Sequence, residues 1–367
     1  MPYTPRLGTI MQNSFKYAVV FAGQGAQKPG MGKSLYEVSP AARAVFDRAG
    51  DGIKHDCFEA DAERLKQTEV TQPAVYTMCM AAYAALREGL RVDDADGFPE
   101  PSAVAGFSLG EYAALTAAGV IDSIETGLAI VKIRSLLMKE AGTNPDGSQR
   151  GTMAAGMGSK DAVLSLVEKA RGDDILEAVN FNSPQQTVVA GDAAAVERFS
   201  SLAKEDRSLG VKAIPLPVSG AFHSPIMKPA AEGLALALDD FSFGTPTLDI
   251  YLNSTGGKFS DYDPASDTDA DAYLPNRPQT DGTNSDTKAK SAMVRQIQSP
   301  VHWQKTIEAM VTTKIDAIIE VGPGKTLSSL AKKIVPEFTI LHVEDAESLA
   351  KTIDTANGTN STINLNA

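Results

Sequence analysis

The most restrictive feature of this sequence is a Gly-x-Ser-x-Gly pentapeptide at residues 106–110, which a short apolar run precedes and an alanine-rich helical pattern follows. Glycine at both ends allows a sharp turn from a strand into a helix and lifts the central hydroxyl clear of the sheet. The unpaired N–H groups of Leu109 and Gly110 then open the helix, where its dipole favours a developing oxyanion. The pattern predicts that Ser108 is a nucleophile. The alternative is a serine that only caps the helix in a tight β–α turn.

Strand and helix patterns alternate on both sides of this pentapeptide. The alternation predicts an α/β fold, with a large α/β-hydrolase-like domain built on a mostly parallel sheet. Pro73 is expected to break one helix near its start. The segments are 17–22 (strand), 33–50 (helix), 71–90 (helix), 103–105 (strand), 123–140 (helix) and 316–330 (strand, Gly-Pro-Gly loop and helix).

Residues 143–216 have a different pattern. Their predicted elements follow the order β-α-β-β-α-β, which is the split-βαβ, ferredoxin-like arrangement. We interpret them as a smaller α+β domain inserted into the large catalytic domain, which then comprises residues 17–142 and 217–367. Residues 258–290 are rich in Asp, Ser, Thr and Asn and are expected to form a mobile surface insertion. Residues 1–16 are expected to be a disordered lead-in.

Composition and charge exclude several classes of protein. The formal net charge of −12 argues against a nucleic-acid partner, which would require a basic face. No apolar run is long enough for a membrane span, and the first residues lack the pattern of a signal peptide. Cys57 and Cys79 have no metal or redox spacing, so both are expected to be buried in a cytoplasmic protein. We expect a monomer.

One acidic segment imitates the start of a calcium-binding loop. Asp267, Asp269 and Asp271 have the spacing of its first ligands. However, Ala272 stands where the loop requires glycine, and Pro278 stands where the closing glutamate belongs. The sequence therefore predicts no metal site.

Three residues outside the pentapeptide are candidates for chemistry. Gln24 lies in a glycine-rich loop after the first strand and could present its amide to a ligand. That loop is a poor dinucleotide fingerprint, because Lys28 stands where the third glycine belongs. Arg134 lies in an apolar helix face, where it either binds an anionic ligand or snorkels or pairs. His223 lies in a loop bounded by Gly, Ser and Pro, a better place for a catalytic base than those of the other histidines, His55, His302 and His342.

Seven segments, taken together, carry a family resemblance. They begin at Phe21 (FAGQGAQ), Gly106 (GFSLGE), Val131 (VKIRSLLM), Asn182 (NSPQQ), Gly220 (GAFHSP), Arg295 (RQIQSPVHW) and Glu320 (EVGPGKTL). In this order the chain resembles the malonyl-CoA:acyl-carrier-protein transacylases, the acyltransferases that load fatty acid and polyketide synthesis. The matches cover most of residues 17–345.

The resemblance implies a role for each of five residues. Ser108 would be the nucleophile and His223 its base, held by backbone carbonyls rather than by an aspartate. Gln24 and the N–H of Leu109 would form the oxyanion hole. Arg134 would bind the free carboxylate of malonate, since a guanidinium can hold a carboxylate by two parallel hydrogen bonds.

Three further substrate-binding residues follow from the resemblance. Gln296 and Asn182 would line the site, and Phe222 is the family's usual mark of selectivity for malonyl over methylmalonyl groups. The sequence departs from the family at Phe107, where the family usually has histidine, and in the insertion at 258–290.

The reaction that the resemblance implies is malonyl transfer by a ping-pong route. The malonyl group would pass from malonyl-CoA to Ser108 and then to the phosphopantetheine thiol of acyl carrier protein, in fatty acid biosynthesis and without a bound cofactor. One alternative is the loading of a polyketide carrier protein. Another is a serine thioesterase or hydrolase, whose late histidine would be His302 or His342. A third is a non-enzymatic scaffold that keeps the fold.

Overall fold

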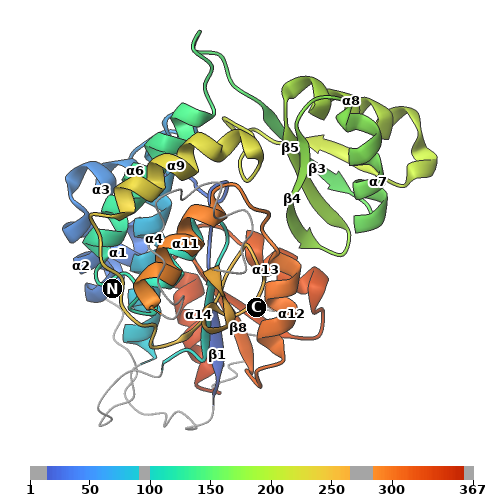
Figure 1. The fold of residues 1–367 in the computed structure, drawn as a ribbon. Helices are drawn as coiled ribbons and strands as arrows, with labels where there is room; N and C mark the ends of the chain where they lie inside the picture. Colours follow the sequence, from blue (N-terminus) through green and yellow to red (C-terminus); the bar gives the residue numbers. More distant parts are fainter. Residues whose placement is uncertain (1–14, 91–99, 265–283, 359–367) are drawn as a thin grey trace.

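The computed structural model describes residues 15–90, 100–264 and 284–358 of the chain. A five-stranded parallel sheet forms the centre of the larger part of the molecule (Figure 1). In order across the sheet, its strands are β7 (Asp249–Tyr251), β2 (Ala103–Gly106), β1 (Tyr17–Phe21), β8 (Ala317–Val321) and β9 (Thr339–Val343).

The central strand β1 is buried on both of its faces. Because successive side chains of a strand alternate, Tyr17, Val19 and Phe21 join the larger hydrophobic core. Ala18 and Val20 join a second core on the opposite face. A strand in this position has to be apolar throughout, and this explains the uninterrupted YAVVF run.

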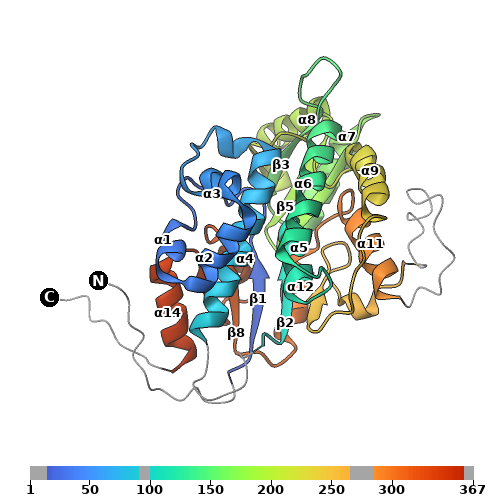
Figure 2. The same ribbon diagram turned by 90° about the vertical axis from the view of Figure 1, so that its left-hand side faces the viewer.

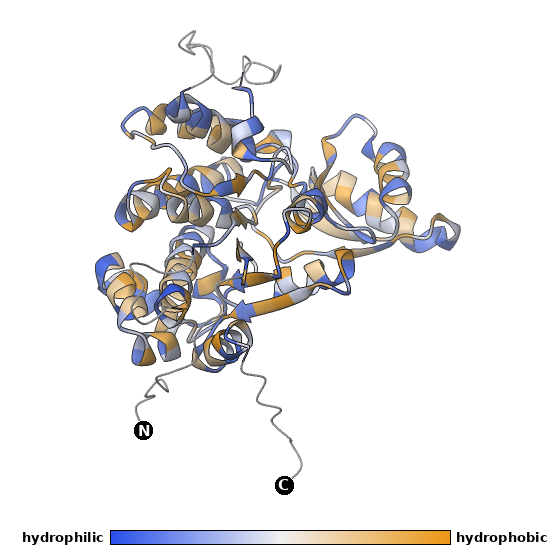
Figure 3. Ribbon diagram, turned by 90° about the horizontal axis from the view of Figure 1, so that it is seen from below, coloured by the Kyte–Doolittle hydropathy of each residue, from blue (hydrophilic) through white to orange (hydrophobic). Residues whose placement is uncertain are grey.

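Helices cover both faces of this sheet (Figures 1 and 2). Hydrophobic and hydrophilic residues alternate along the helices (Figure 3), and the hydrophobic ones of the strands and helices form two buried cores. The second core contains α12 (Trp303–Val311) and α13 (Thr326–Ile334). The larger core contains α1 (Lys33–Val38), α2 (Pro40–Ala49), α3 (Asp51–Phe58), α4 (Thr68–Gly89), α5 (Gly110–Ala117), α6 (Ile124–Ala141), α9 (Lys228–Leu238), α11 (Ser285–Gln296) and α14 (Ala346–Ala356). None of the helices in the described ranges combines the length and hydropathy needed to cross a bilayer.

Two helical segments differ from the sequence prediction. The pattern at 33–50 is divided at Ser39, which has an extended backbone and whose hydroxyl caps α2 by accepting the N–H of Ala42. The expected break at Pro73 does not occur, because α4 begins at Thr68 and continues through the proline. Nearly the whole of α4 is buried, and this packing outweighs the hydrogen bond that proline cannot make.

Residues 152–215 form a second, four-stranded antiparallel sheet beside the first (Figure 1). Its strand order is β4-β5-β3-β6, which is the ferredoxin-like order, and α7 and α8 pack on it around a hydrophobic core of their own. The predicted fold class is thus confirmed for both parts. The elements are β3 (Thr152–Met157), α7 (Lys160–Arg171), β4 (Leu176–Ser183), β5 (Gln186–Gly191), α8 (Ala193–Glu205) and β6 (Lys212–Pro215).

Strand β4 joins this smaller part to the larger one through backbone hydrogen bonds. The N–H of Phe181 donates to the carbonyl of Val301 over 2.9 Å, and the N–H of Val301 donates to the carbonyl of Val179 over 2.8 Å. The ring of Phe181 also stacks on that of His302, with 5.2 Å between the centroids. The segment before α12 therefore extends the smaller sheet by one short strand pairing.

The predicted mobile insertion at 258–290 is wrong at both of its ends. Phe259 and Tyr262 are buried in the larger core, and α11 already begins at Ser285. Polar composition concealed these anchors, because two aromatic side chains are enough to fix a short segment. Residues 265–283 of the insertion and residues 1–14 of the predicted lead-in lie outside the described residues.

The separate core of the smaller part predicts how the protein responds to a cavity there. Phe199 of α8 is fully buried in that core, so Phe199→Ala should lower the free energy of unfolding by about 3–5 kcal/mol. Hydrogen exchange should show protection lost in residues 152–215 and kept in the parallel sheet. Leu236→Ala is the control, because Leu236 is 75% exposed. Equal loss of protection in both sheets would contradict the existence of a separate core.

Candidate active site

The candidate residues gather at the carboxyl edge of the parallel sheet. The glycine-rich loop with Gln24 follows β1, Ser108 follows β2 and Asn253 follows β7. Parallel strands bring the loops after their carboxyl ends to one edge, where open α/β sheets bind their ligands. The sheet therefore brings together residues that are far apart in the sequence.

The turn at Ser108 has the geometry of a nucleophile elbow. Ser108 has φ 50°, in the left-handed region that residues with a Cβ rarely adopt. A methyl group on Gly106 would lie 1.9 Å from the carbonyl carbon of Gly110, and one on Gly110 would lie 2.2 Å from the carbonyl oxygen of Phe21. Both glycines are therefore required by the close approach of strand and helix, as the pentapeptide predicts.

Ser108 and His223 form a hydrogen-bonded pair. Nε2 of His223 lies 2.8 Å from Oγ of Ser108, and Nδ1 lies 2.9 Å from the backbone carbonyl oxygen of Gln296. Since a carbonyl only accepts, Nδ1 carries the proton and Nε2 is left to accept the hydroxyl. His223 also has a positive φ, 64°. A backbone carbonyl thus holds this histidine where a carboxylate holds it in a catalytic triad.

Burial keeps the imidazole of His223 neutral. Burial and, second, the charge of Arg134 lower its pKa to about 4, although the hydrogen bond to the Gln296 carbonyl acts in the opposite direction. The ring is consequently able to take the Ser108 proton at neutral pH.

Arg134 places a buried guanidinium beside Ser108. It is 1% exposed and donates from Nη1 to Oε1 of Gln72 over 2.6 Å. Its Nη2 donates to Oγ of Ser108 over 3.1 Å and to Oε1 of Gln296 over 3.2 Å. Its Cζ lies 5.1 Å from the ring centroid of Tyr112, and burial lowers the pKa of the guanidinium. These partners are mostly neutral, which leaves the cation available for an anionic ligand.

The two predicted oxyanion-hole residues have backbone N–H groups that are not used in the described fold. The backbone N–H groups of Gln24 and Leu109 donate to no acceptor in the described part of the chain. The side-chain amide of Gln24 is used internally, with Nε2 donating to Thr68 over 3.3 Å and Oε1 accepting from Gln72 over 3.2 Å. In this structure neighbouring polar side chains of α4 hold the side-chain amide of Gln24.

The other predicted residues have different surroundings. Gln296 lies in the site, since its Nε2 donates to the carbonyl of Ser108 over 2.7 Å. Phe222 is 7% exposed and packs into the larger core directly before His223. Asn182 lies on β4; its Nδ2 donates to Gln186, its Oδ1 is buried without a partner, and it has no hydrogen bond to Ser108, His223 or Arg134.

Phe107, which departs from the family pattern, has a packing role. Its ring meets that of Trp303 edge to face, with 5.4 Å between the centroids, in the core beneath the sheet. Its carbonyl accepts the N–H of Gly110 and so takes part in the turn.

Three buried neighbours of Ser108 and Arg134 escaped the sequence analysis. Gln72 holds Arg134, and Asn253 accepts the backbone N–H of Ser108 over 2.6 Å. Glu111 is 1% exposed, and burial raises its carboxyl pKa to about 8. Glu111 could have been suspected, because it is a charged residue in an otherwise apolar helical run directly after the pentapeptide. Gln72 and Asn253 have no such local signal.

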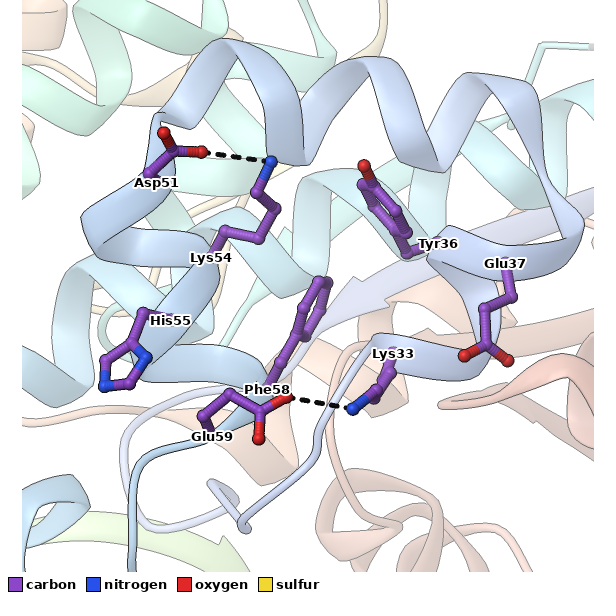
Figure 4. A pocket seen from close by; sticks show the side chains of 8 residues that line it. All are labelled: Lys33, Tyr36, Glu37, Asp51, Lys54, His55, Phe58 and Glu59. Atoms are coloured by element: carbon purple, nitrogen blue, oxygen red, sulfur yellow. Dashed lines mark hydrogen bonds and ion pairs between the residues drawn. The ribbon is translucent and has the colours of Figure 1, made fainter.

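A separate hollow on the surface involves only α1 and α3 (Figure 4). Two ion pairs cross it, Lys33 with Glu59 over 2.9 Å and Lys54 with Asp51 over 3.2 Å. None of its lining residues hydrogen-bonds to Ser108, His223 or Arg134. The described residues contain no group of three His, Cys, Asp or Glu that could hold a metal ion, and the calcium-like aspartates at 267–271 lie outside them.

Comparison with known proteins identifies the family. The sequence profile described as "Acyl transferase domain" matches residues 18–361. The malonyl CoA-acyl carrier protein transacylase of Haemophilus influenzae is 37% identical over 341 residues, covering 91% of this chain and 96% of that protein. The chain belongs to the malonyl CoA-acyl carrier protein transacylase family. It is therefore an acyltransferase, as the resemblance implies.

Solved structures of transacylases share the fold. That of malonyl CoA-acyl carrier protein transacylase from Clostridium perfringens has a TM-score of 0.77 and 33% identity, covering 94% of this chain and 98% of that chain. A structure of a type II PKS acyl-carrier protein in complex with its malonyl-transacylase has a TM-score of 0.77 and 31% identity, covering 93% of this chain and 99% of that chain. The family match includes every site residue described above.

The lowered pKa of His223 predicts that acylation of Ser108 continues at acidic pH. Acylation of Ser108 by p-nitrophenyl acetate should fall to half only near pH 4, where an unperturbed histidine would lose half near pH 6.5. Quenched-flow mass spectrometry of the Ser108 peptide measures this rate. The same shift lowers stability as pH falls from about 6.5 to about 4, because the unfolded chain takes up the proton first. A kinetic midpoint near 6.5 would show that the ring is solvated.

Proposed function

We propose that this chain transfers a malonyl group from malonyl-CoA to the phosphopantetheine thiol of acyl carrier protein through an ester on Ser108. The observation that carries the proposal is the position of the Ser108 hydroxyl. It lies 2.8 Å from the neutral base His223 and 3.1 Å from the buried cation of Arg134. A nucleophile, its base and a carboxylate-binding group thus meet at one atom. The names of the relatives support this choice of acyl donor and acceptor.

In the first half-reaction, Oγ of Ser108 attacks the thioester carbonyl while Nε2 of His223 takes its proton. The N–H groups of Gln24 and Leu109 stabilise the oxyanion that develops on that carbonyl. Collapse breaks the carbon–sulfur bond, and the protonated His223 gives its proton to the departing CoA thiolate. The product is a malonyl-Ser108 ester and a neutral histidine.

The second half-reaction runs through the same groups. His223 takes the proton of the phosphopantetheine thiol, and the sulfur attacks the ester carbonyl. Ser108 then leaves with that proton, which restores the resting pair. Because both halves use one serine, CoA departs before the carrier reacts, and neither half requires a bound cofactor.

Arg134 accounts for the choice of a malonyl group. A carboxylate that replaces the contact to Ser108 could receive two parallel hydrogen bonds from the guanidinium. An acetyl group would leave the buried cation without an anionic partner, which is unfavourable. Gln72 and Gln296 hold the guanidinium in place for this exchange.

The positions of the remaining histidines count against a hydrolase triad. His302 stacks on Phe181, and His342 lies beside Glu344 with 4.0 Å between Nε2 and the carboxylate oxygen. Neither hydrogen-bonds to Ser108, so neither supports the order Ser, acid, late His.

We place the reaction in cytoplasmic fatty acid biosynthesis, with loading of a polyketide carrier as the second candidate. The similarity to a malonyl-transacylase that is in complex with a type II PKS acyl-carrier protein favours the second candidate. Radiolabelled malonyl-CoA with each type of carrier protein decides between them. Label on the carrier supports a transferase, and the faster-loaded carrier identifies the route. Release of free malonate alone would support a hydrolase.

The catalytic pair is tested by two substitutions. Ser108→Ala should abolish the malonyl adduct, because it removes the attacking oxygen. His223→Ala should slow adduct formation by about 10²–10⁴-fold, the usual contribution of a positioned base. Mass spectrometry of the intact protein after mixing with malonyl-CoA measures both effects. Near-normal transfer by His223→Ala would rule out this histidine as the base.

The role of Arg134 is tested by the ratio of two substrates. Arg134→Ala should lose malonyl transfer and keep or gain acetyl transfer, because Ser108 and His223 are unchanged. Leaving the cation unpaired costs about 3–5 kcal/mol, so the native preference for malonyl should be roughly a hundredfold or more. The kcat/KM values for malonyl-CoA and acetyl-CoA measure the ratio. Equal losses with both substrates and a lower Tm would mean that Arg134 only braces the helix.

A further inference from the structure

Asn253 forms hydrogen bonds to both sides of the nucleophile elbow. Its Oδ1 accepts the backbone N–H of Ser108 over 2.6 Å, and its Nδ2 donates to the backbone carbonyl of Gly106, also over 2.6 Å. The side-chain amide thus spans the turn from the last residue of β2 to the nucleophile. Asn253 is 1% exposed, so neither bond competes with bulk water.

The backbone of Asn253 is itself fixed in place. Its N–H donates to Oε2 of Glu111 over 2.5 Å, and its carbonyl accepts the N–H of His302 over 2.9 Å. Glu111 belongs to the first turn of α5, and its own N–H donates to the carbonyl of Ser108. Glu111 of α5, the helix that follows the elbow, therefore fixes Asn253, and Asn253 in turn fixes the elbow.

From this closed set of bonds we infer that Asn253 is a positioning residue for the nucleophile. We call Asn253 with its contacts to Gly106, Ser108 and Glu111 the elbow clamp. The inference deepens the proposed function and rests on it, because it concerns how Oγ of Ser108 is oriented for attack. It assigns no contact between Asn253 and the acyl group.

The left-handed conformation of Ser108 explains why a clamp is needed. With φ at 50° the turn is unfavourable for a residue with a Cβ, and it persists only where its surroundings enforce it. Asn253 fixes the peptide on the N–H side of Ser108, and Gln296 fixes the peptide on its carbonyl side over 2.7 Å. The peptide that Gln296 contacts also carries the N–H of Leu109. Fixing both peptides therefore orients Oγ of Ser108 and one donor of the oxyanion hole.

The pair of bonds requires one acceptor and one donor at adjacent positions. Asparagine supplies both, whereas an ionised aspartate supplies only acceptors and would direct a negative oxygen at the Gly106 carbonyl. A protonated aspartate has one carbonyl oxygen and one O–H, which restores the pattern of asparagine. Asn253→Asp is therefore an isosteric variant whose clamp depends on pH.

The charged groups around this position are known from the structure. Glu111 of α5 contacts its backbone, and the main-chain N–H of His302 contacts its carbonyl. His223 and Arg134 lie on the other side of Ser108. Burial and the carbonyl oxygen of Gly106, which can only accept a hydrogen bond, favour the protonated form of an aspartate at 253, which brings its titration toward neutral pH.

The decisive experiment compares Asn253→Asp with the native chain between pH 5 and pH 8.5, using malonyl-CoA. At the upper limit kcat should fall by about 10²-fold, the cost of a small displacement of the reacting atom, while KM changes by less than about twofold. As the pH falls, the ratio of variant to native kcat should recover at least about tenfold. A ratio that stays constant across this range, whether low or equal to one, would overturn the inference.

Two further variants cover a failure of Asn253→Asp to fold. Asn253→Ala should lose kcat by about 10²-fold and keep KM, and its Ser108 should be acylated correspondingly slowly by p-nitrophenyl acetate. Native kcat with only a lower Tm would mean that Asn253 is merely structural.

Asn284→Asp is the matched control, since Asn284 also accepts a backbone N–H, that of Asp286 over 2.9 Å, at the start of α11. It should keep native kcat at every pH. Failure of the native chain itself to form a Ser108 ester would refute the proposed function instead.

Discussion

The hydrogen bond between Ser108 and His223 joins residues that are 115 positions apart, and the rest of the site is arranged around it. One partner projects from a tight turn at the edge of the parallel sheet, and the other from a loop after the smaller part of the chain. Among the described residues, Lys314 is the only other non-glycine residue with positive φ. Unfavourable backbone conformation is thus concentrated at the Ser108–His223 pair, where the surrounding packing maintains it.

The electrostatics of the site follow from burial more than from ion pairing. A neutral imidazole is held by a carbonyl, and a buried guanidinium is surrounded by amides, an aromatic ring and the serine hydroxyl. An aspartate behind His223 would raise its pKa and could neutralise Arg134, which would weaken the attraction for a substrate carboxylate. The carbonyl of Gln296 orients the ring without adding charge, so orientation and anion binding can coexist within a few ångströms.

Short motifs made much of this structure predictable. The pentapeptide placed Ser108, an isolated loop histidine suggested His223, and a cation in an apolar helix suggested Arg134, because each departs from its local pattern. The role of Asn253 was not predictable, because it depends on a hydrogen bond to Ser108, which lies 145 positions away in the sequence. The same limit applies to Gln72, whose amide is unremarkable in a polar stretch of helix. At Pro73 the sequence predicts a helix break, and at Phe259 it predicts a mobile segment. Burial outweighs both local patterns in the folded chain.

The pairing of β4 with Val301 affects how such enzymes can be recombined. The segment that carries Val301 continues into His302, whose N–H binds the carbonyl of Asn253. A smaller part transplanted from a relative at residues 152–215 would bring a foreign β4 against a native partner strand. Any shift in that pairing would displace His302, the residue after Val301, and with it the hydrogen bond from His302 to Asn253. The modular unit for building chimaeras is therefore discontinuous, and it includes the segment before α12 together with the inserted sheet.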